Sequence, residues 1–138
     1  MLTEAENQRL TLTGRGTPMG ELFRRYWQPA LLSRELQAGG APKRIKILGE
    51  DFIAFRDGAG RAGVIDPRCP HRGADLFFGR NEHAGLRCAY HGWQFDVHGT
   101  CLDIPTATPK AAASLKPKAT VPNLQVRESA DMIWVHFG

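Results

Sequence analysis

The chain has 138 residues, of which 42% are hydrophobic and 23% are charged, and its formal net charge is +4 from 18 Lys and Arg against 14 Asp and Glu. This length and composition predict one globular domain with a core, and they exclude a disordered tail and a pair of well-packed domains. No apolar run approaches the roughly 20 residues of a membrane helix, and no dense basic block is present, so we expect neither a membrane nor a nucleic acid as partner.

Two short helices are predicted at the N-terminal end. Thr3 and Glu6 have the spacing of a capping box, which begins the first helix. Thr17 stands before a proline, as N-cap residues often do, and begins the second helix. Leu22 and Tyr26 are spaced to stack within this second helix.

From Gln28-Pro29, which should end the second helix, the sequence changes to short apolar or alternating runs. Turn residues separate these runs at Gly49-Glu50-Asp51 and at Asp57-Gly58-Ala59-Gly60, where antiparallel hairpins need them. The prediction is a mainly β architecture, a compact sandwich or barrel, with the biased stretch from Thr106 to Thr120 as a long surface loop. The domain organisation we expect is a helical lead over residues 1–27 and a main domain over residues 28–138.

Two separate segments each offer one cysteine and one histidine. The first contains Cys69 and His71, and the second contains Cys88 and His91. Thiolate and imidazole are ligands for zinc or an iron–sulfur cluster and are poor hosts for calcium or magnesium. Ordinary zinc fingers keep their cysteines together, whereas this chain mixes the two types, as two loops facing each other across a dinuclear cluster would require. A structural zinc site is the alternative.

The stretch CPHRGADL followed by CAYHGWQFD closely resembles the Rieske domain of ring-hydroxylating oxygenases, especially the phthalate dioxygenase-like terminal oxygenases. The resemblance extends over most of the chain, from about Gly16 to Gly138. It implies a Rieske-type antiparallel β sandwich or barrel, with a cluster-binding subdomain of two loops and short N-terminal helices. It also implies a Rieske-type [2Fe–2S] cluster, with Cys69 and Cys88 on one iron and His71 and His91 on the other.

The same resemblance implies a function. The chain is expected to transfer electrons through the cluster, as the N-terminal domain of an oxygenase alpha subunit that acts on aromatic compounds. A reductase or ferredoxin is the expected electron donor, and a homotrimer is the expected assembly. In that family oxygen chemistry takes place on a mononuclear iron in a following domain, and this chain stops at Gly138 without such a ligand set, so we expect no catalytic residue in it. A stand-alone Rieske ferredoxin is the alternative, although such ferredoxins usually lack a long N-terminal lead.

Other reactive side chains are not expected to belong to the site. His83, His98 and His136 have no partner at ligand spacing. Cys101 is expected to be a buried thiol, and Trp93 to pack beneath the second loop. Three cysteines, two of them beside histidines, favour metal ligation over a secreted disulfide framework, and the acidic N-terminal region does not resemble a signal peptide, so we expect a cytoplasmic protein.

Two features around the loops have two interpretations each. Gly73 and Gly92 follow the histidines, where a missing side chain either lets backbone N–H groups approach the cluster sulfurs or only permits a turn. The arginines that flank the loops either dock an acidic reductase domain or pair with nearby carboxylates. These arginines are Arg68, Arg72, Arg80 and Arg87, and the carboxylates are Asp75, Glu82 and Asp96.

Overall fold

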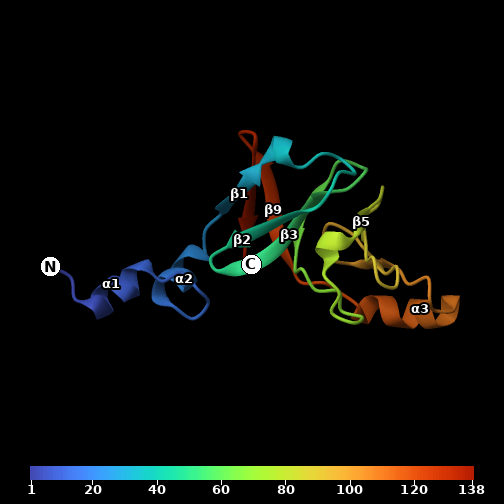
Figure 1. Ribbon diagram of the computed structural model, residues 1–138, viewed down its shortest axis with the longest axis horizontal. Coiled ribbons are helices and arrows are strands. Elements are labelled where there is room, and N and C mark those ends of the chain that lie inside the picture. The colour runs from blue at the N-terminus through green and yellow to red at the C-terminus, as the bar shows by residue number, and fades with distance from the viewer.

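The computed structural model describes residues 1–138 and contains two antiparallel sheets. The larger sheet has six strands in the order β1-β10-β9-β4-β3-β2 (Figure 1). These strands are β1 (Gln28–Leu32), β2 (Lys43–Ile47), β3 (Glu50–Arg56), β4 (Ala62–Ile65), β9 (Asn123–Ser129) and β10 (Met132–His136). Since the two edge strands β1 and β2 come into contact, the sheet is a nearly closed barrel, and the predicted mainly β class is confirmed.

A smaller sheet of four strands is inserted between β4 and β9. Its strands, in spatial as well as chain order, are β5 (Arg80–Asn81), β6 (Leu86–Arg87), β7 (Gln94–Phe95) and β8 (Cys101–Asp103). Because Ile65 of β4 pairs with Asn123 of β9, residues 66–122 leave the barrel and return to it at the same place. We call these residues the lobe; it lies beside the barrel in Figure 1 and carries both Cys/His loops.

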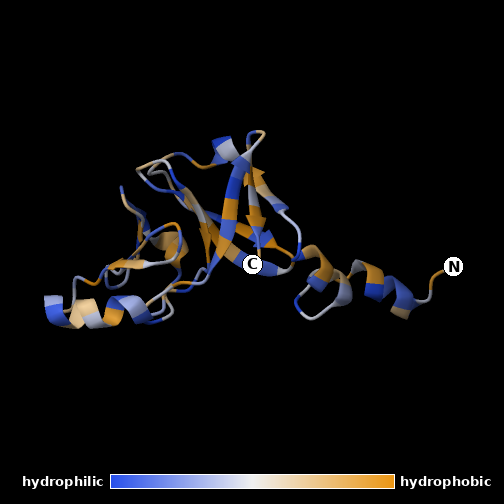
Figure 2. Ribbon diagram, turned by 180° about the vertical axis from the view of Figure 1, so that it is seen from behind, coloured by the Kyte–Doolittle hydropathy of each residue, from blue (hydrophilic) through white to orange (hydrophobic).

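The first helix extends away from the barrel at the N-terminal end (Figures 1 and 2). Helix α1 (Glu4–Thr11) begins with the predicted capping box, in which the Thr3 amide donates to Glu6 Oε2 at 2.7 Å and the Glu6 amide donates to Thr3 Oγ1 at 3.3 Å. No residue of this helix is buried, so the cap and not tertiary packing fixes where it begins. None of the α-helices has the length and apolar character that a membrane crossing requires.

The second helix begins as predicted but is shorter than expected. Thr17 caps helix α2 (Pro18–Phe23) through its side chain. The helix ends before Tyr26, so the predicted stacking of Leu22 and Tyr26 within it is wrong. Gln28 lies against this end of the helix: its Nε2 donates to the carbonyl oxygen of Phe23, the last helical residue, at 2.9 Å and to that of Tyr26, in the turn that follows, at 3.2 Å.

The long surface loop predicted from Thr106 to Thr120 is also wrong. This stretch contains helix α3 (Pro109–Leu115), followed by the 3-10 turn η3 (Lys116–Lys118). Thr108 caps α3 and proline stands at its first turn, an arrangement that favours a helix start, and the alanines that follow are strong helix formers. Ala112 is buried in the core of the lobe, which gives the helix a fixed position.

The barrel and the lobe have separate hydrophobic cores that share β3 as a wall. Phe52 and Ala54 face the barrel core, whereas Ile53 and Phe55 face the core of the lobe. This explains the continuous apolar run in β3, since a strand covered on both faces needs no polar side. The lobe core also includes both loop cysteines, so the loops are anchored in packed protein and not in solvent.

Candidate metal centre

The first loop, Cys69–Ala74, follows β4 and is closed by two backbone hydrogen bonds. The Gly73 amide donates to the Cys69 carbonyl at 2.9 Å, and the Cys69 amide donates to the Ala74 carbonyl at 2.9 Å. Gly73 has a φ of +70°, a left-handed conformation that residues with a Cβ adopt only with strain. The turn interpretation of this glycine is therefore supported by its backbone.

The second loop, Cys88–Trp93, joins β6 to β7 and repeats the same turn. The Gly92 amide donates to the Cys88 carbonyl at 3.1 Å, the Cys88 amide donates to the Trp93 carbonyl at 2.8 Å, and Gly92 has a φ of +77°. Each loop thus begins with a cysteine and has a left-handed glycine four residues later. The histidine is the third residue of the first loop and the fourth of the second.

The two loop thiols are free and lie in the core of the lobe. Cys69 is 2% exposed and Cys88 is 4% exposed. Burial raises the pKa of Cys69 to about 11; the His71 amide opposes this, and the neighbouring Cys88 thiol adds to it. A thiol that ionises so reluctantly becomes a thiolate when a metal ion binds it, because coordination removes the proton outright. Two such thiols side by side fit a metal centre.

The two loop imidazoles lie at the more exposed end of the same site. His71 and His91 are half-buried, and their ring centroids are 4.6 Å apart with 74° between the planes. Burial and then the neighbouring His91 lower the pKa of His71, which favours the neutral imidazole that ligates metals. On the other side, the ring of Trp93 stacks on His71 at 4.5 Å and 8°. Trp93 is thus buried beneath the second loop, as predicted, and its stacking also restrains the orientation of the His71 ring.

All four predicted donors line one pocket. The residues around it are Cys69, His71, Arg72, Ala74, Cys88, Tyr90, His91 and Trp93. The thiols of Cys69 and Cys88 lie beside each other, and so do the imidazoles of His71 and His91. A thiol pair and an imidazole pair fit a dinuclear group with sulfur on one metal and nitrogen on the other.

The remaining histidines and the third cysteine lie outside this pocket. His83 and His98 are exposed on the lobe, and the ring of His136 lies 5.4 Å from that of Trp27. Cys101 is a buried free thiol, as predicted, and its sulfur lies 3.7 Å from the carbonyl oxygen of Asp103.

Two of the flanking arginines pair with a carboxylate, as one of the two interpretations has it. Arg80 and Arg87 approach Glu82 at 2.6 Å and 3.0 Å. Arg87 also bonds to Gln94 and Asp103, residues that no sequence motif marks. They lie 7 and 16 residues from Arg87 in the chain, and no local pattern connects them; only the pairing of the four short strands brings them together.

The other two flanking arginines do not pair with the predicted carboxylates. Asp75 pairs with Arg44 at 2.7 Å instead. Asp96 accepts backbone hydrogen bonds within its own turn. Arg68 and Arg72 take part in none of the ion pairs. Arg68 Nη1 donates instead to the Gly73 carbonyl of the first loop at 3.3 Å, and Arg72 is exposed beside that loop.

Comparison with known proteins agrees with this geometry. The family model of the Rieske [2Fe-2S] domain matches residues 26–125. The chain belongs to the Rieske [2Fe-2S] domain family. The resemblance first inferred from the two loop sequences is confirmed, and membership implies a Rieske-type [2Fe–2S] cluster as the cofactor.

Several curated oxygenase subunits are similar over the whole chain. The 3-chlorobenzoate-3,4-dioxygenase oxygenase subunit of Comamonas testosteroni is 49% identical over 138 residues, which is 100% of this chain and 32% of that protein. The phthalate 4,5-dioxygenase oxygenase subunit of Pseudomonas putida is 40% identical over 139 residues, 100% of this chain and 31% of that protein. The chain therefore spans about a third of the length of these relatives.

Two solved structures have the same fold over most of this chain. Apo dicamba monooxygenase superposes with a TM-score of 0.72 at 30% identity, over 83% of this chain and 34% of that chain. NdmA of Pseudomonas putida CBB5 with caffeine superposes with a TM-score of 0.70 at 29% identity, over 86% of this chain and 34% of that chain.

Proposed function

We propose that this domain carries single electrons on a [2Fe–2S] cluster held by four side chains. In this proposal Cys69 and Cys88 bind one iron, and His71 and His91 bind the other. The observation that carries it is the separation of the donors within one pocket, with two buried thiols at one end and two half-buried imidazoles at the other. When bound, the cluster supplies a one-electron carrier whose potential lies at about −150 to +300 mV, because two neutral histidines replace two thiolates.

The residues of the chain hold and shield this site. Cys69 and Cys88 lie in the apolar core of the lobe, which keeps water from the sulfur end. Trp93 supports the His71 ring from below. Because His71 and His91 are the more exposed donors, electrons should enter and leave at the imidazole end, where a partner protein comes closest.

We infer further that the domain is the N-terminal part of an oxygenase alpha subunit that acts on aromatic compounds. The dioxygenase names of two relatives, at 49% and 40% identity over the whole chain, support this. In the proposal a reductase or ferredoxin donates electrons, and the complete enzyme is a homotrimer whose mononuclear iron lies outside these residues. Three free cysteines support a cytoplasmic location. The start of the family match at residue 26 supports a helical lead over residues 1–27 and a Rieske domain over residues 28–138.

The test of the proposed function is to purify the 138-residue chain without oxygen and to measure iron, acid-labile sulfide and zinc together with its electron paramagnetic resonance spectrum. We expect two irons and two sulfides per chain and a Rieske-type signal in the reduced protein. A colourless protein with one zinc per chain would overturn the proposal.

Variants localise the cluster within the chain. We expect Cys69→Ala and His91→Ala to lose the signal, because each removes one of the four donors. His98→Ala is the matched control, since His98 is exposed and lies outside the pocket. A variant lacking Cys69 or His91 that kept the full signal would show that this donor assignment is wrong.

A further inference from the structure

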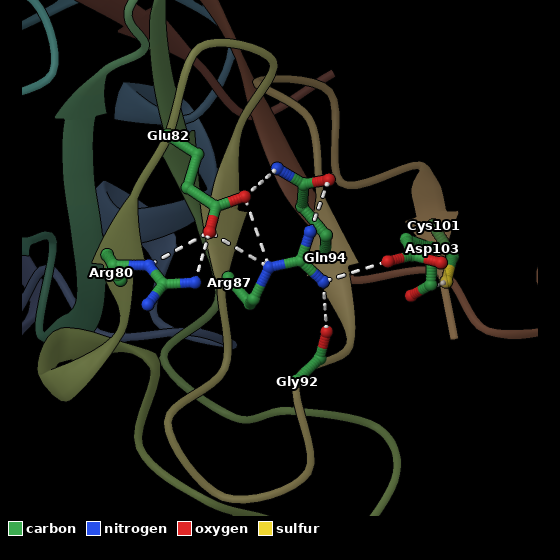
Figure 3. A network of polar contacts seen from close by, with 7 residues as sticks. All are labelled: Arg80, Glu82, Arg87, Gly92, Gln94, Cys101 and Asp103. Atoms are coloured by element: carbon green, nitrogen blue, oxygen red, sulfur yellow. Dashed lines mark hydrogen bonds and ion pairs between the residues drawn. The ribbon is translucent and has the colours of Figure 1, made fainter. Parts of the chain in front are cut away.

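A single guanidinium connects three strands of the lobe sheet with the residue that follows the fourth. Figure 3 shows Arg87, on β6, surrounded by Glu82, Gln94 and Asp103, which follow β5 or lie on β7 and β8. Arg87 Nε donates to the two carboxylate oxygens of Glu82 at 3.0 Å and 3.1 Å. Its Nη1 donates to Asp103 at 2.9 Å, and its Nη2 donates to the Gln94 amide oxygen at 3.3 Å. Gln94 in turn donates to Glu82 at 3.0 Å, which closes the network.

The shortest bond of this guanidinium reaches the second loop. Arg87 Nη1 donates to the backbone carbonyl of Gly92 at 2.6 Å (Figure 3). The Gly92 amide is already bonded to the Cys88 carbonyl at 3.1 Å, so both peptide groups of this left-handed glycine are held. Arg87 immediately precedes Cys88, and Gly92 immediately follows His91. The guanidinium therefore joins the beginning and the end of the loop that presents one cysteine and one histidine.

We propose that Arg87 is a positioning residue for the metal centre, which fixes His91 through the Gly92 carbonyl and places one positive charge beside the cluster. This inference rests on the proposed function, because it takes His91 to be an iron ligand.

The chemistry of arginine suits this task. A planar guanidinium has five N–H donors in fixed directions, whereas a lysine ammonium has three donors on a flexible stem. Arg87 uses its donors on four different groups at once. Lysine at this position would retain the charge but could not hold Glu82, Asp103 and the Gly92 carbonyl together.

The charge itself has a predictable effect. Hydrogen bonds from Arg87 and then Arg80 hold the pKa of Glu82 below its usual value, so Glu82 is ionised at neutral pH. Without Arg87, the carboxylates of Glu82 and Asp103 are left with Arg80 as the only cation of the network. Negative charge close to the cluster opposes the addition of an electron, so the midpoint potential should fall.

Arg80 provides a matched control. It pairs with the same carboxylate of Glu82 at 2.6 Å, but it is 76% exposed and makes no bond to the second loop. Arg80→Gln therefore removes one positive charge and one ion pair without touching Gly92.

The experiment compares the cluster-loaded 138-residue chain with Arg87→Lys, Arg87→Gln and Arg80→Gln. The measurements are iron content, thermal unfolding, the midpoint potential and the g-values of the reduced cluster. We expect Arg87→Gln to lower the potential and to shift the g-values. Arg87→Lys should recover the potential in part but not the g-values, and Arg80→Gln should leave the g-values unchanged.

Three results would overturn the proposal. The first is Arg87 variants that keep the g-values and potential of the unmodified chain, and the second is an Arg80→Gln variant with the same g-shift as Arg87→Gln. The third is unfolding of both Arg87 variants, which would assign Arg87 to the stability of the sheet alone. Folded Arg87 variants that lose iron while Arg80→Gln retains it would support it. Failure of the proposed function is distinct, because then the unmodified chain itself shows no Rieske signal.

Discussion

The imidazole ring of His71 lies parallel to the indole ring of Trp93, with the ring centroids 4.5 Å apart and 8° between the planes. The two residues come from different loops, so this stack connects the first loop to the second. Trp93 is 8% exposed, and its indole N–H has no hydrogen-bond partner within the chain. The indole therefore stabilises the site by packing and stacking and not by hydrogen bonding.

Replacing Trp93 should accordingly loosen the first loop. Trp93→Ala leaves a cavity beneath His71, and we expect a loss of about 3–5 kcal/mol in the free energy of unfolding together with a lower iron content. Trp93→Phe keeps a flat ring and removes an unpartnered N–H, so its loss should be smaller. Denaturant unfolding and iron analysis measure both effects. Equal stability of the alanine and phenylalanine variants would contradict a role for stacking.

A change of donor type at His71 should alter the potential in a known direction. His71→Cys replaces a neutral imidazole by a thiolate, which adds negative charge to the cluster and disfavours its reduction. The midpoint potential should fall by about 100 mV or more, towards the roughly −400 mV of all-cysteine plant-type ferredoxins. His98→Cys is the control, because His98 is exposed and outside the pocket. An unchanged potential in a loaded His71→Cys protein would show that His71 does not bind iron.

The meeting of the four donor side chains was predictable from the sequence because the information is local. Each loop carries its cysteine and histidine two or three residues apart and places a glycine where the turn needs a positive φ. Once the same turn forms twice in one lobe, the donors of both loops can meet. The β class was predictable for a similar reason, since hairpin turns such as Asp57-Gly58-Ala59-Gly60 lie in the local sequence.

Other features of the site and fold are not predicted by the sequence. They depend either on contacts between distant segments or on a helix signal that lies within a biased composition. The stack of Trp93 on His71 and the bonds of Arg87 to Asp103 join segments that only the strand pairing of the lobe brings together. Helix α3 has a local signal, the cap at Thr108 followed by proline and alanines, but the biased Ala, Lys and Pro composition of this stretch favours a loop. The burial of Ala112 in the lobe core, which fixes this helix, cannot be read from composition.

The barrel should lose stability in acid through a pair that lies outside the lobe. Arg56 on β3 bonds to Glu128 on β9 and holds the pKa of this carboxyl below its ordinary value of 4.5. A carboxyl with a lowered folded-state pKa contributes stability that is complete above the unfolded-state pKa and is lost as the pH falls through the folded-state value. Urea unfolding of the cluster-free chain should therefore show stability declining below about pH 4.5. Glu128→Gln should decline less over the same range, and identical pH profiles would contradict the assignment.

The two loop glycines provide a matched pair of substitutions. Both have a positive φ, +70° at Gly73 and +77° at Gly92, so alanine at either position should cost about 1–2 kcal/mol from backbone strain. A Cβ on Gly92 would also lie 3.0 Å from Cγ of Pro105, whereas a Cβ on Gly73 would meet nothing within 4 Å. Gly92→Ala should therefore reduce both stability and iron content more than Gly73→Ala, as measured by denaturant unfolding and metal analysis. A larger loss in Gly73→Ala would contradict this prediction. It would mean that the cluster or a partner contacts the open side of the first loop more closely than Pro105 contacts the second loop.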